Sequence, residues 1–143
     1  MQLVGRSEFP FEPVPKFIPS EERQYVVRAI TAHKSGFHLA SFLYLRSFVE
    51  QYLRRITNAK NAKLRGDQLS ARYTKWLKEN EPRFPRSHFV SLGHVYDDLS
   101  AHIHAGHDSE TYAEQFKENL HNVTVHFEQL DLMRRAAKKL AAE

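Results

Sequence analysis

The distribution of proline divides the chain into two parts. Four of its six prolines fall within the first nineteen residues, and none occurs between Pro19 and Pro82. Proline lacks a backbone donor and biases the preceding residue toward an extended conformation, so residues 1–19 cannot form the interior of a helix. We therefore predict an extended arm over 1–19, followed by a folded domain over 20–143.

The arm carries more large apolar side chains than a solvated tail needs. We expect these side chains to lie in a groove of the same domain or of a partner subunit. The alternative is a disordered tail, and the aromatic content of the arm argues against it. The residues concerned are Phe9, Phe11, Val14, Phe17 and Ile18.

After the arm, apolar residues recur at spacings of three and four, the period of amphipathic helices. Ser20 is a suitable N-cap for the first helix, and Gly36 and Gly106 are placed to end helices. The sequence predicts an all-α fold, an antiparallel bundle of four or five helices around one core. The expected helices cover 21–33, 37–58, 67–80, 87–105 and a segment that begins near residue 108 or 109.

Length and composition narrow the class of protein. The 143 residues suit one domain, and the absence of cysteine excludes disulfides, thiolate nucleophiles and cysteine-based metal sites. No stretch approaches the roughly 18 consecutive apolar residues of a membrane span, and the first residues lack the features of a secretory signal. We expect a cytoplasmic protein that does not associate with membranes and needs no cofactor.

Charge is distributed unevenly along the chain. The segment 54–65 has five basic residues and no acidic one, whereas 97–116 has five acidic residues and neither lysine nor arginine. A basic loop beside a helix end can contact phosphates, so we consider a nucleic-acid interface here, with a solvated turn as the alternative. The candidate nucleic-acid-binding residues are Arg54, Arg55, Lys60, Lys63 and Arg65, with Asn58 and Asn61 as neutral hydrogen-bonding groups.

Three histidines, His102, His104 and His107, lie within six residues of each other. His94, Asp98 and His102 follow one helical stripe and have a spacing compatible with a divalent metal, but a metal site needs three or four convergent ligands, so we do not favour one. We expect His104 to be partly buried and His102 to face solvent.

A second hypothesis for this region is acid–base catalysis by His104. An imidazole can transfer a proton near neutral pH, and a nearby arginine could stabilise a phosphorane-like transition state. Arg46 is that candidate arginine. Arg46, Glu50 and Arg54 are four residues apart, which fits either an ion-pair ladder along a helix or a glutamate that orients a guanidinium toward a groove.

Two stretches, FLYLRSFVEQYLRRI at 42–56 and HVYDDLSAHIHAGH at 94–107, resemble helical HEPN-like domains. The resemblance covers about residues 20–133. It implies a compact helical bundle, commonly dimeric, of a group with many metal-independent ribonucleases and partners in toxin, defence and nucleotidyltransferase systems. The matching residues are Arg46 and Glu50 on one helix and Tyr96, Leu99, Ser100 and His104 on another.

The sequence departs from the active ribonucleases of this group at one position. Those enzymes carry an arginine four to six residues before the histidine, whereas the stretch before His104, with Asp97, Asp98 and Leu99, contains none. We therefore expect a bacterial module that binds RNA or a protein partner, acts in a defence or toxin–antitoxin type system, and forms a homodimer. The alternatives are a ribonuclease that uses His104 with Arg46 and Glu50, and a histidine-based metal-binding protein.

Overall fold

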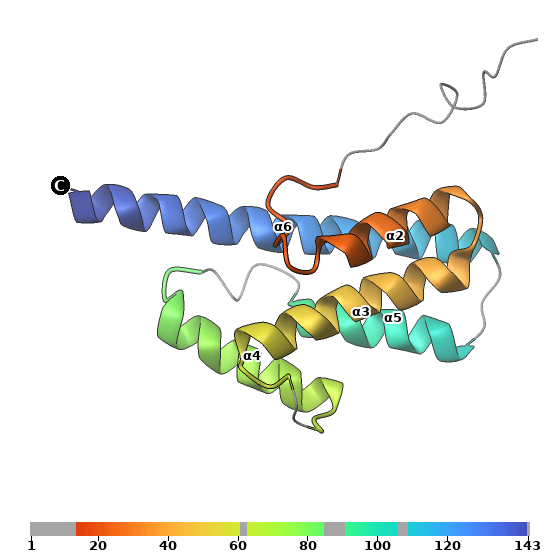
Figure 1. The fold of residues 1–143 in the computed structure, drawn as a ribbon, viewed down its shortest axis with the longest axis horizontal. Helices are drawn as coiled ribbons and strands as arrows, with labels where there is room; N and C mark the ends of the chain where they lie inside the picture. The colour runs from red at the N-terminus through yellow and green to blue at the C-terminus, as the bar shows by residue number, and fades with distance from the viewer. Residues whose placement is uncertain (1–13, 61–62, 85–90, 106–108, 143) are drawn as a thin grey trace, which may run out of the picture.

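The structure, a computed structural model, describes residues 14–60, 63–84, 91–105 and 109–142. Over these ranges it contains five α-helices and no strand, labelled as in Figure 1. They are α2 (Arg23–Lys34), α3 (His38–Ile56), α4 (Gly66–Asn80), α5 (Leu92–Ala105) and α6 (Ser109–Ala142). The all-α prediction is confirmed, and the helices pack as a bundle. Within the described ranges, no helix combines the length and apolarity that a membrane crossing requires.

Helix α3 lies at the centre of the bundle and contacts α2, α4, α5 and α6. Its apolar residues recur every three or four positions, so one face turns inward along its whole length. The spacing predicts that this face consists of Phe42, Leu45, Val49, Tyr52, Leu53 and Ile56. The structure adds Phe48, which is fully buried, and leaves Ile56 only half-buried. The buried residues of this face are Phe42, Leu45, Phe48, Val49, Tyr52 and Leu53.

Asn58 determines where α3 ends. Its φ of 56° is left-handed, a conformation that asparagine tolerates better than most residues. The amide of Ala59 donates to the carbonyl of Arg54 at 2.7 Å, and the amide of Asn58 donates to that of Arg55 at 3.3 Å. These two bonds form a Schellman motif, which satisfies carbonyls of the last turn and redirects the chain. Gly36, with φ 81°, occupies the same position after α2, so its predicted role is confirmed.

The predicted helix starts were less accurate. Helix α2 begins at Arg23 without a side-chain cap, so the prediction of Ser20 as its N-cap is wrong. Helix α5 begins later than residue 87, because Ser91 is its cap: the Ser91 hydroxyl accepts a bond from the His94 amide at 3.0 Å.

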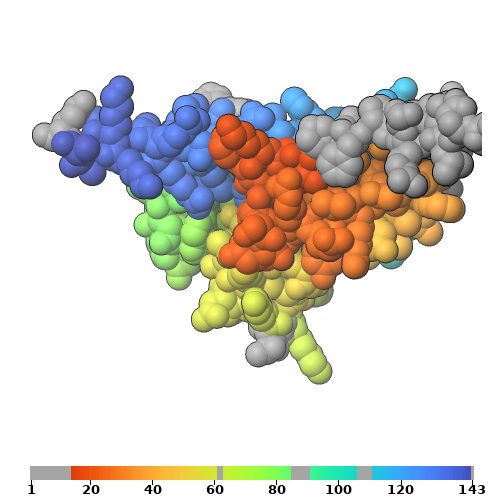
Figure 2. Space-filling view, turned by 45° about the horizontal axis from the view of Figure 1, so that its top comes forward, coloured from red at the N-terminus to blue at the C-terminus, as the bar shows by residue number. Residues whose placement is uncertain are grey.

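The end of the proline-rich arm packs on its own domain, which is one of the two arrangements predicted for it. Val14 and Ile18 are buried in the core, and Phe17 is partly buried against it. Figure 2 shows this segment in red, lying between α2 and α6. Other residues considered above lie outside the described residues, namely Phe9, Phe11, Asn61, Gly106 and His107.

Candidate functional sites on α3, α4 and α5

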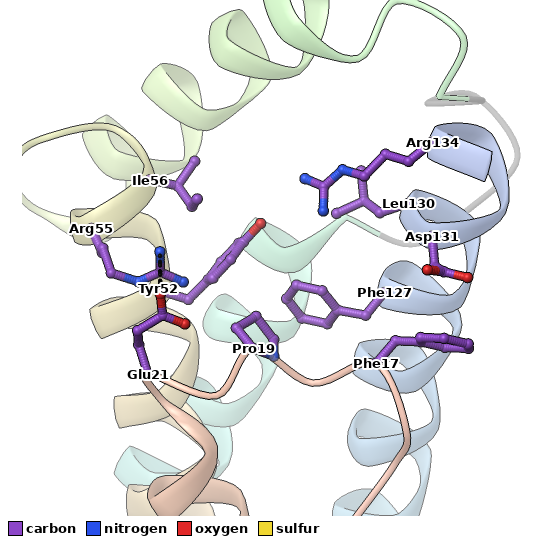
Figure 3. A pocket seen from close by; sticks show the side chains of 10 residues that line it. All are labelled: Phe17, Pro19, Glu21, Tyr52, Arg55, Ile56, Phe127, Leu130, Asp131 and Arg134. Carbon is purple, nitrogen blue, oxygen red and sulfur yellow. Dashed lines mark ion pairs between the residues drawn. The ribbon is translucent and has the colours of Figure 1, made fainter. Parts of the chain in front are cut away.

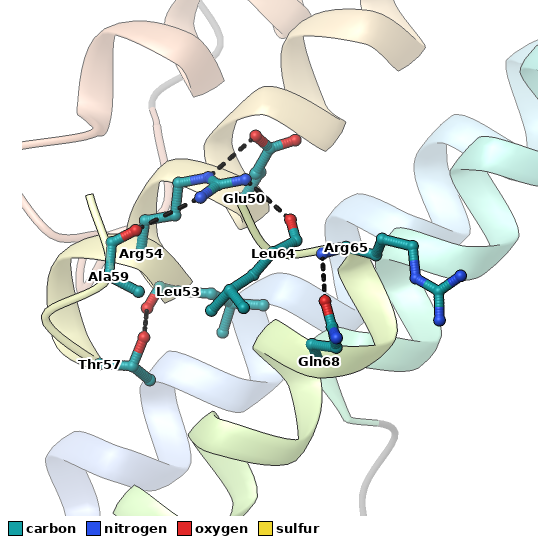
Figure 4. A network of polar contacts seen from close by, with 8 residues as sticks. All are labelled: Glu50, Leu53, Arg54, Thr57, Ala59, Leu64, Arg65 and Gln68. Carbon is teal, nitrogen blue, oxygen red and sulfur yellow. Dashed lines mark hydrogen bonds and ion pairs between the residues drawn. The ribbon is translucent and has the colours of Figure 1, made fainter. Parts of the chain in front are cut away.

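Arg54 holds the α3–α4 connection against the helix from which it leaves (Figure 4). Its Nη1 donates to the carbonyl of Ala59 at 3.3 Å, and its Nη2 donates to that of Leu64 at 3.0 Å. Its Nε pairs with Glu50 at 3.1 Å, which realises one half of the predicted ion-pair ladder. Because all three guanidinium nitrogens bond to the protein, Arg54 has a structural role here.

The guanidinium of Arg55 is likewise bonded to the protein itself, at the start of α2. Its Nε and Nη2 donate to the two carboxylate oxygens of Glu22 at 2.7 and 2.9 Å, and Nη1 lies 3.3 Å from Glu21. The hydrogen bond to Glu22 raises the pKa of the Arg55 guanidinium. Two of the five candidate nucleic-acid-binding residues are thus held in contacts with the protein itself.

The other three candidates, Lys60, Lys63 and Arg65, are exposed. They lie in the two yellow segments on either side of residues 61–62, which project from the body of the molecule in Figure 2. Arg65 has an ion pair with Asp67 at 3.5 Å, and both side chains are largely exposed. Such a pair is weak in water and leaves the charge of Arg65 accessible to a phosphate.

An open groove of about 480 Å³ runs between the end of α3 and the outer face of α4. Exposed Arg72 and Lys75 line it, together with the half-buried ring of Trp76. The Trp76 ring stacks on Tyr73 at a centroid distance of 5.7 Å, which fixes its orientation. Helical spacing predicts that Trp76 shares the core face of α4 with Leu69, Tyr73 and Leu77, and its ring packs at the edge of that face. Arg72 and Lys75 were not among the predicted site residues, although their spacing of three places both on one helix face.

A second constellation lies where α3 and α5 run side by side in opposite directions. The Nη1 of Arg46 donates to the Ser100 hydroxyl at 3.5 Å. Glu50 is one turn further along α3, and it lies near Tyr96, which is one turn earlier on α5. Burial and the negative charge of Glu50 together raise the pKa of the Tyr96 hydroxyl. Arg46 therefore faces the stripe of α5 that continues from Ser100 to His104.

The expected exposure of the two described histidines at the end of α5 was wrong. His104 is exposed, and the side chain of His102 is only 14% exposed. His102 packs beside Phe42, and its Nδ1 bonds to the carbonyl of Asp98 at 2.8 Å. The Tyr112 hydroxyl donates to the His102 carbonyl at 2.9 Å, so α6 also packs against this end of α5.

The metal candidates His94, Asp98 and His102 do not form a three-ligand site, although Nδ1 of His102 lies 3.6 Å from the Asp98 carboxylate. His94 is exposed, and the Asp98 carboxylate accepts a hydrogen bond from Asn119 at 2.8 Å. Across the described part of the chain, no three histidine, aspartate or glutamate side chains are arranged to hold a metal ion.

No family model, curated protein or solved structure matches the chain.

Proposed function

We propose that the chain is a cytoplasmic, HEPN-like module that binds single-stranded RNA through the α3–α4 basic surface. Bacterial defence and toxin–antitoxin systems are the setting that the sequence resemblance suggests for it. The observation that carries the proposal is the groove in which two cations flank Trp76. We define the α3–α4 basic surface as Lys60, Lys63, Arg65, Arg72, Lys75 and Trp76.

The chemistry of this surface fits single-stranded nucleic acid better than a folded protein partner. Exposed lysines and arginines along an edge attract the phosphate backbone, and an aromatic ring between them offers a platform for an unpaired base. Cations outnumber anions in the groove, where Glu79 is the single acidic residue lining it. An RNA duplex would present few unstacked bases to Trp76, so we favour a single strand.

Substitutions in the groove test this proposal without disturbing the fold. We expect the double variant Arg72→Gln/Lys75→Gln to bind a fluorescein-labelled oligouridylate about tenfold more weakly in fluorescence anisotropy, with a shallower dependence on salt. Lys138→Gln/Lys139→Gln, which removes two exposed cations from the end of α6, is the matched control. Equal affinities of the two double variants would refute the proposal.

A homodimer is the second part of the proposal. It is supported by large apolar side chains on the surface at the start of α3, where Phe37 is 67%, Leu39 50% and Leu43 39% exposed. Apolar groups gathered on a surface commonly mark a protein interface. Sedimentation should show a dimer at tens of micromolar for the wild type and a monomer for Leu39→Glu/Leu43→Glu, whereas a monomeric wild type would exclude this part.

A metal-independent ribonuclease is the second candidate function, favoured by the contact between Arg46 and Ser100. Ser100 lies one helical turn before the exposed His104 on α5. The contact therefore brings the Arg46 guanidinium within about one turn of the His104 imidazole, so that both groups could reach one phosphodiester. RNA incubated with the protein and a chelator should be cleaved by the wild type and by His121→Ala, which changes another exposed histidine, but not by His104→Ala. Equal cleavage by all three would eliminate His104 as the acid–base group.

A further inference from the structure

A pocket of about 270 Å³ lies between the 14–22 segment, α3 and α6, apart from the α3–α4 basic surface (Figure 3). Its walls are of two kinds. Phe127 and Leu130 on α6, with Ile56 across from them on α3, give it apolar surface, while the Tyr52 hydroxyl and the guanidinium of Arg134 point toward one another from opposite sides. The pocket thus offers an apolar surface beside a pair of hydrogen-bond donors.

Tyr52 is the end of a buried chain of polar groups from three helices. Its hydroxyl lies 3.3 Å from the Tyr73 hydroxyl, which lies 2.6 Å from Nε2 of His126. Tyr52 is 2%, Tyr73 3% and His126 1% exposed. Burial, with Arg134 nearby, lowers the pKa of His126 to about 3, so its ring is neutral and carries one N–H.

The buried ring of His126 determines which way the hydrogen bonds of this chain run. Its Nδ1 is buried without a hydrogen-bond partner. A proton there would be an unpaired buried donor, which is rarer in proteins than an unpaired buried acceptor. The proton therefore belongs on Nε2, which donates to the Tyr73 oxygen, and Tyr73 in turn donates to the Tyr52 oxygen. The hydroxyl proton of Tyr52 is then left to donate to a group in the pocket.

The hydrogen-bond donors of the pocket suit an acceptor with a single negative charge. Arg134 uses Nε for its bond to Glu81 at 2.7 Å, and the rest of its guanidinium faces the pocket. The four charged residues that line the pocket, Glu21, Arg55, Asp131 and Arg134, balance to zero. The lining therefore exerts no net attraction on any anion, and the two donors set the preference. One carboxylate can accept from both Tyr52 and Arg134, whereas the second charge of a phosphate would add only the cost of removing it from water.

We propose that this pocket binds a small organic monocarboxylate, whose carboxylate accepts hydrogen bonds from Tyr52 and Arg134 and whose apolar body packs on Phe127 and Leu130. The inference is independent of RNA binding, because the pocket shares only Ile56 with the groove on α4.

Benzoate is a suitable probe, with neutral benzamide and inorganic phosphate for comparison, in calorimetry or in titrations followed by NMR of backbone amides. We expect benzoate to bind with shifts at the pocket residues, and benzamide and phosphate to bind at least about tenfold more weakly. Benzamide or phosphate binding as tightly as benzoate, or no binding of benzoate, would overturn the proposal.

Two substitutions locate the carboxylate. Tyr52→Phe removes a single hydroxyl and should weaken benzoate binding about tenfold, and Arg134→Gln should weaken it at least as much. Lys138→Gln, which removes an exposed cation of the same helix outside the pocket, should leave affinity unchanged. Circular dichroism melts check that each variant folds. If Arg134→Gln does not fold, Tyr52→Phe decides, and an unchanged affinity of that variant refutes the assignment.

Discussion

Arg55 and Glu22 form a two-point ion pair that joins the end of α3 to the start of α2, with both carboxylate oxygens within 2.9 Å of guanidinium nitrogens. The two residues are 33 positions apart, and the Glu22 side chain is only 6% exposed. A buried carboxylate requires such a partner, because an uncompensated charge away from water is costly. The pair holds the 14–22 segment, which forms one wall of the proposed carboxylate pocket between α3 and α6.

Replacing Arg55 with glutamine is expected to lower the free energy of unfolding by about 2–3 kcal/mol, because it leaves the Glu22 carboxylate buried without its cation. Urea denaturation measures this loss. Arg72→Gln is the matched control, since it removes an exposed arginine from the outer face of α4, and it should change stability by less than about 0.5 kcal/mol. Equal losses in the two variants would show that the pair does not stabilise the fold.

Asn58 offers a test of backbone conformation alone. Asn58→Ala should lower the free energy of unfolding by about 1 kcal/mol, because alanine tolerates the left-handed φ of 56° poorly. Asn58→Gly should match or exceed the wild-type stability in the same denaturation experiment. If glycine destabilised the protein as much as alanine, the asparagine side chain would be the stabilising element rather than the conformation.

The buried imidazole of His126 predicts a loss of stability in acid. Its pKa is about 3 in the folded protein against an ordinary value of 6.5, so between these pH values the unfolded chain binds a proton that the folded chain does not. The His126 contribution should therefore lower the free energy of unfolding by about 1.4 kcal/mol for each pH unit between 6.5 and about 3.

The variant His126→Gln isolates that contribution, because glutamine keeps a polar group near Tyr73 but does not titrate. Its stability should depend less steeply on pH between 6.5 and 3. His121→Gln, which changes an exposed histidine on the same helix, should keep the wild-type dependence. A wild-type slope in His126→Gln would mean that other groups cause the acid sensitivity.

The sequence was most informative where a pattern is local. The spacing of Phe42, Leu45 and Val49 predicts the buried face of α3 because helix geometry places them on one side whatever surrounds them. The end of α2 was predicted for the same reason, since Gly36 takes a left-handed conformation without steric cost. The roles of Arg54 and Arg55 depend instead on carbonyls and carboxylates that only the fold brings close, and the basic pattern alone suggested solvent-facing groups.

The two described histidines at the end of α5 illustrate the same limit. His102 and His104 project about 200° apart on a helix, so one turns inward when the other turns outward. Which one does so depends on where the neighbouring helices pack: Phe42 of α3 lies against the His102 ring, and Tyr112 of α6 bonds to the His102 carbonyl. Trp76 is a similar case. The sequence alone does not decide whether an aromatic residue at the edge of an apolar stripe is buried in the core or lines a groove.

RNA binding at the α3–α4 basic surface is the central claim, and the intrinsic fluorescence of Trp76 tests it most directly. Trp76 is the only tryptophan of the chain, so its emission reports on this groove. Titration with unlabelled oligouridylate should quench the emission to saturation, with a midpoint that matches anisotropy and rises with salt, and Arg72→Gln/Lys75→Gln should shift that midpoint about tenfold. RNA binding that leaves the Trp76 emission unchanged would contradict the account.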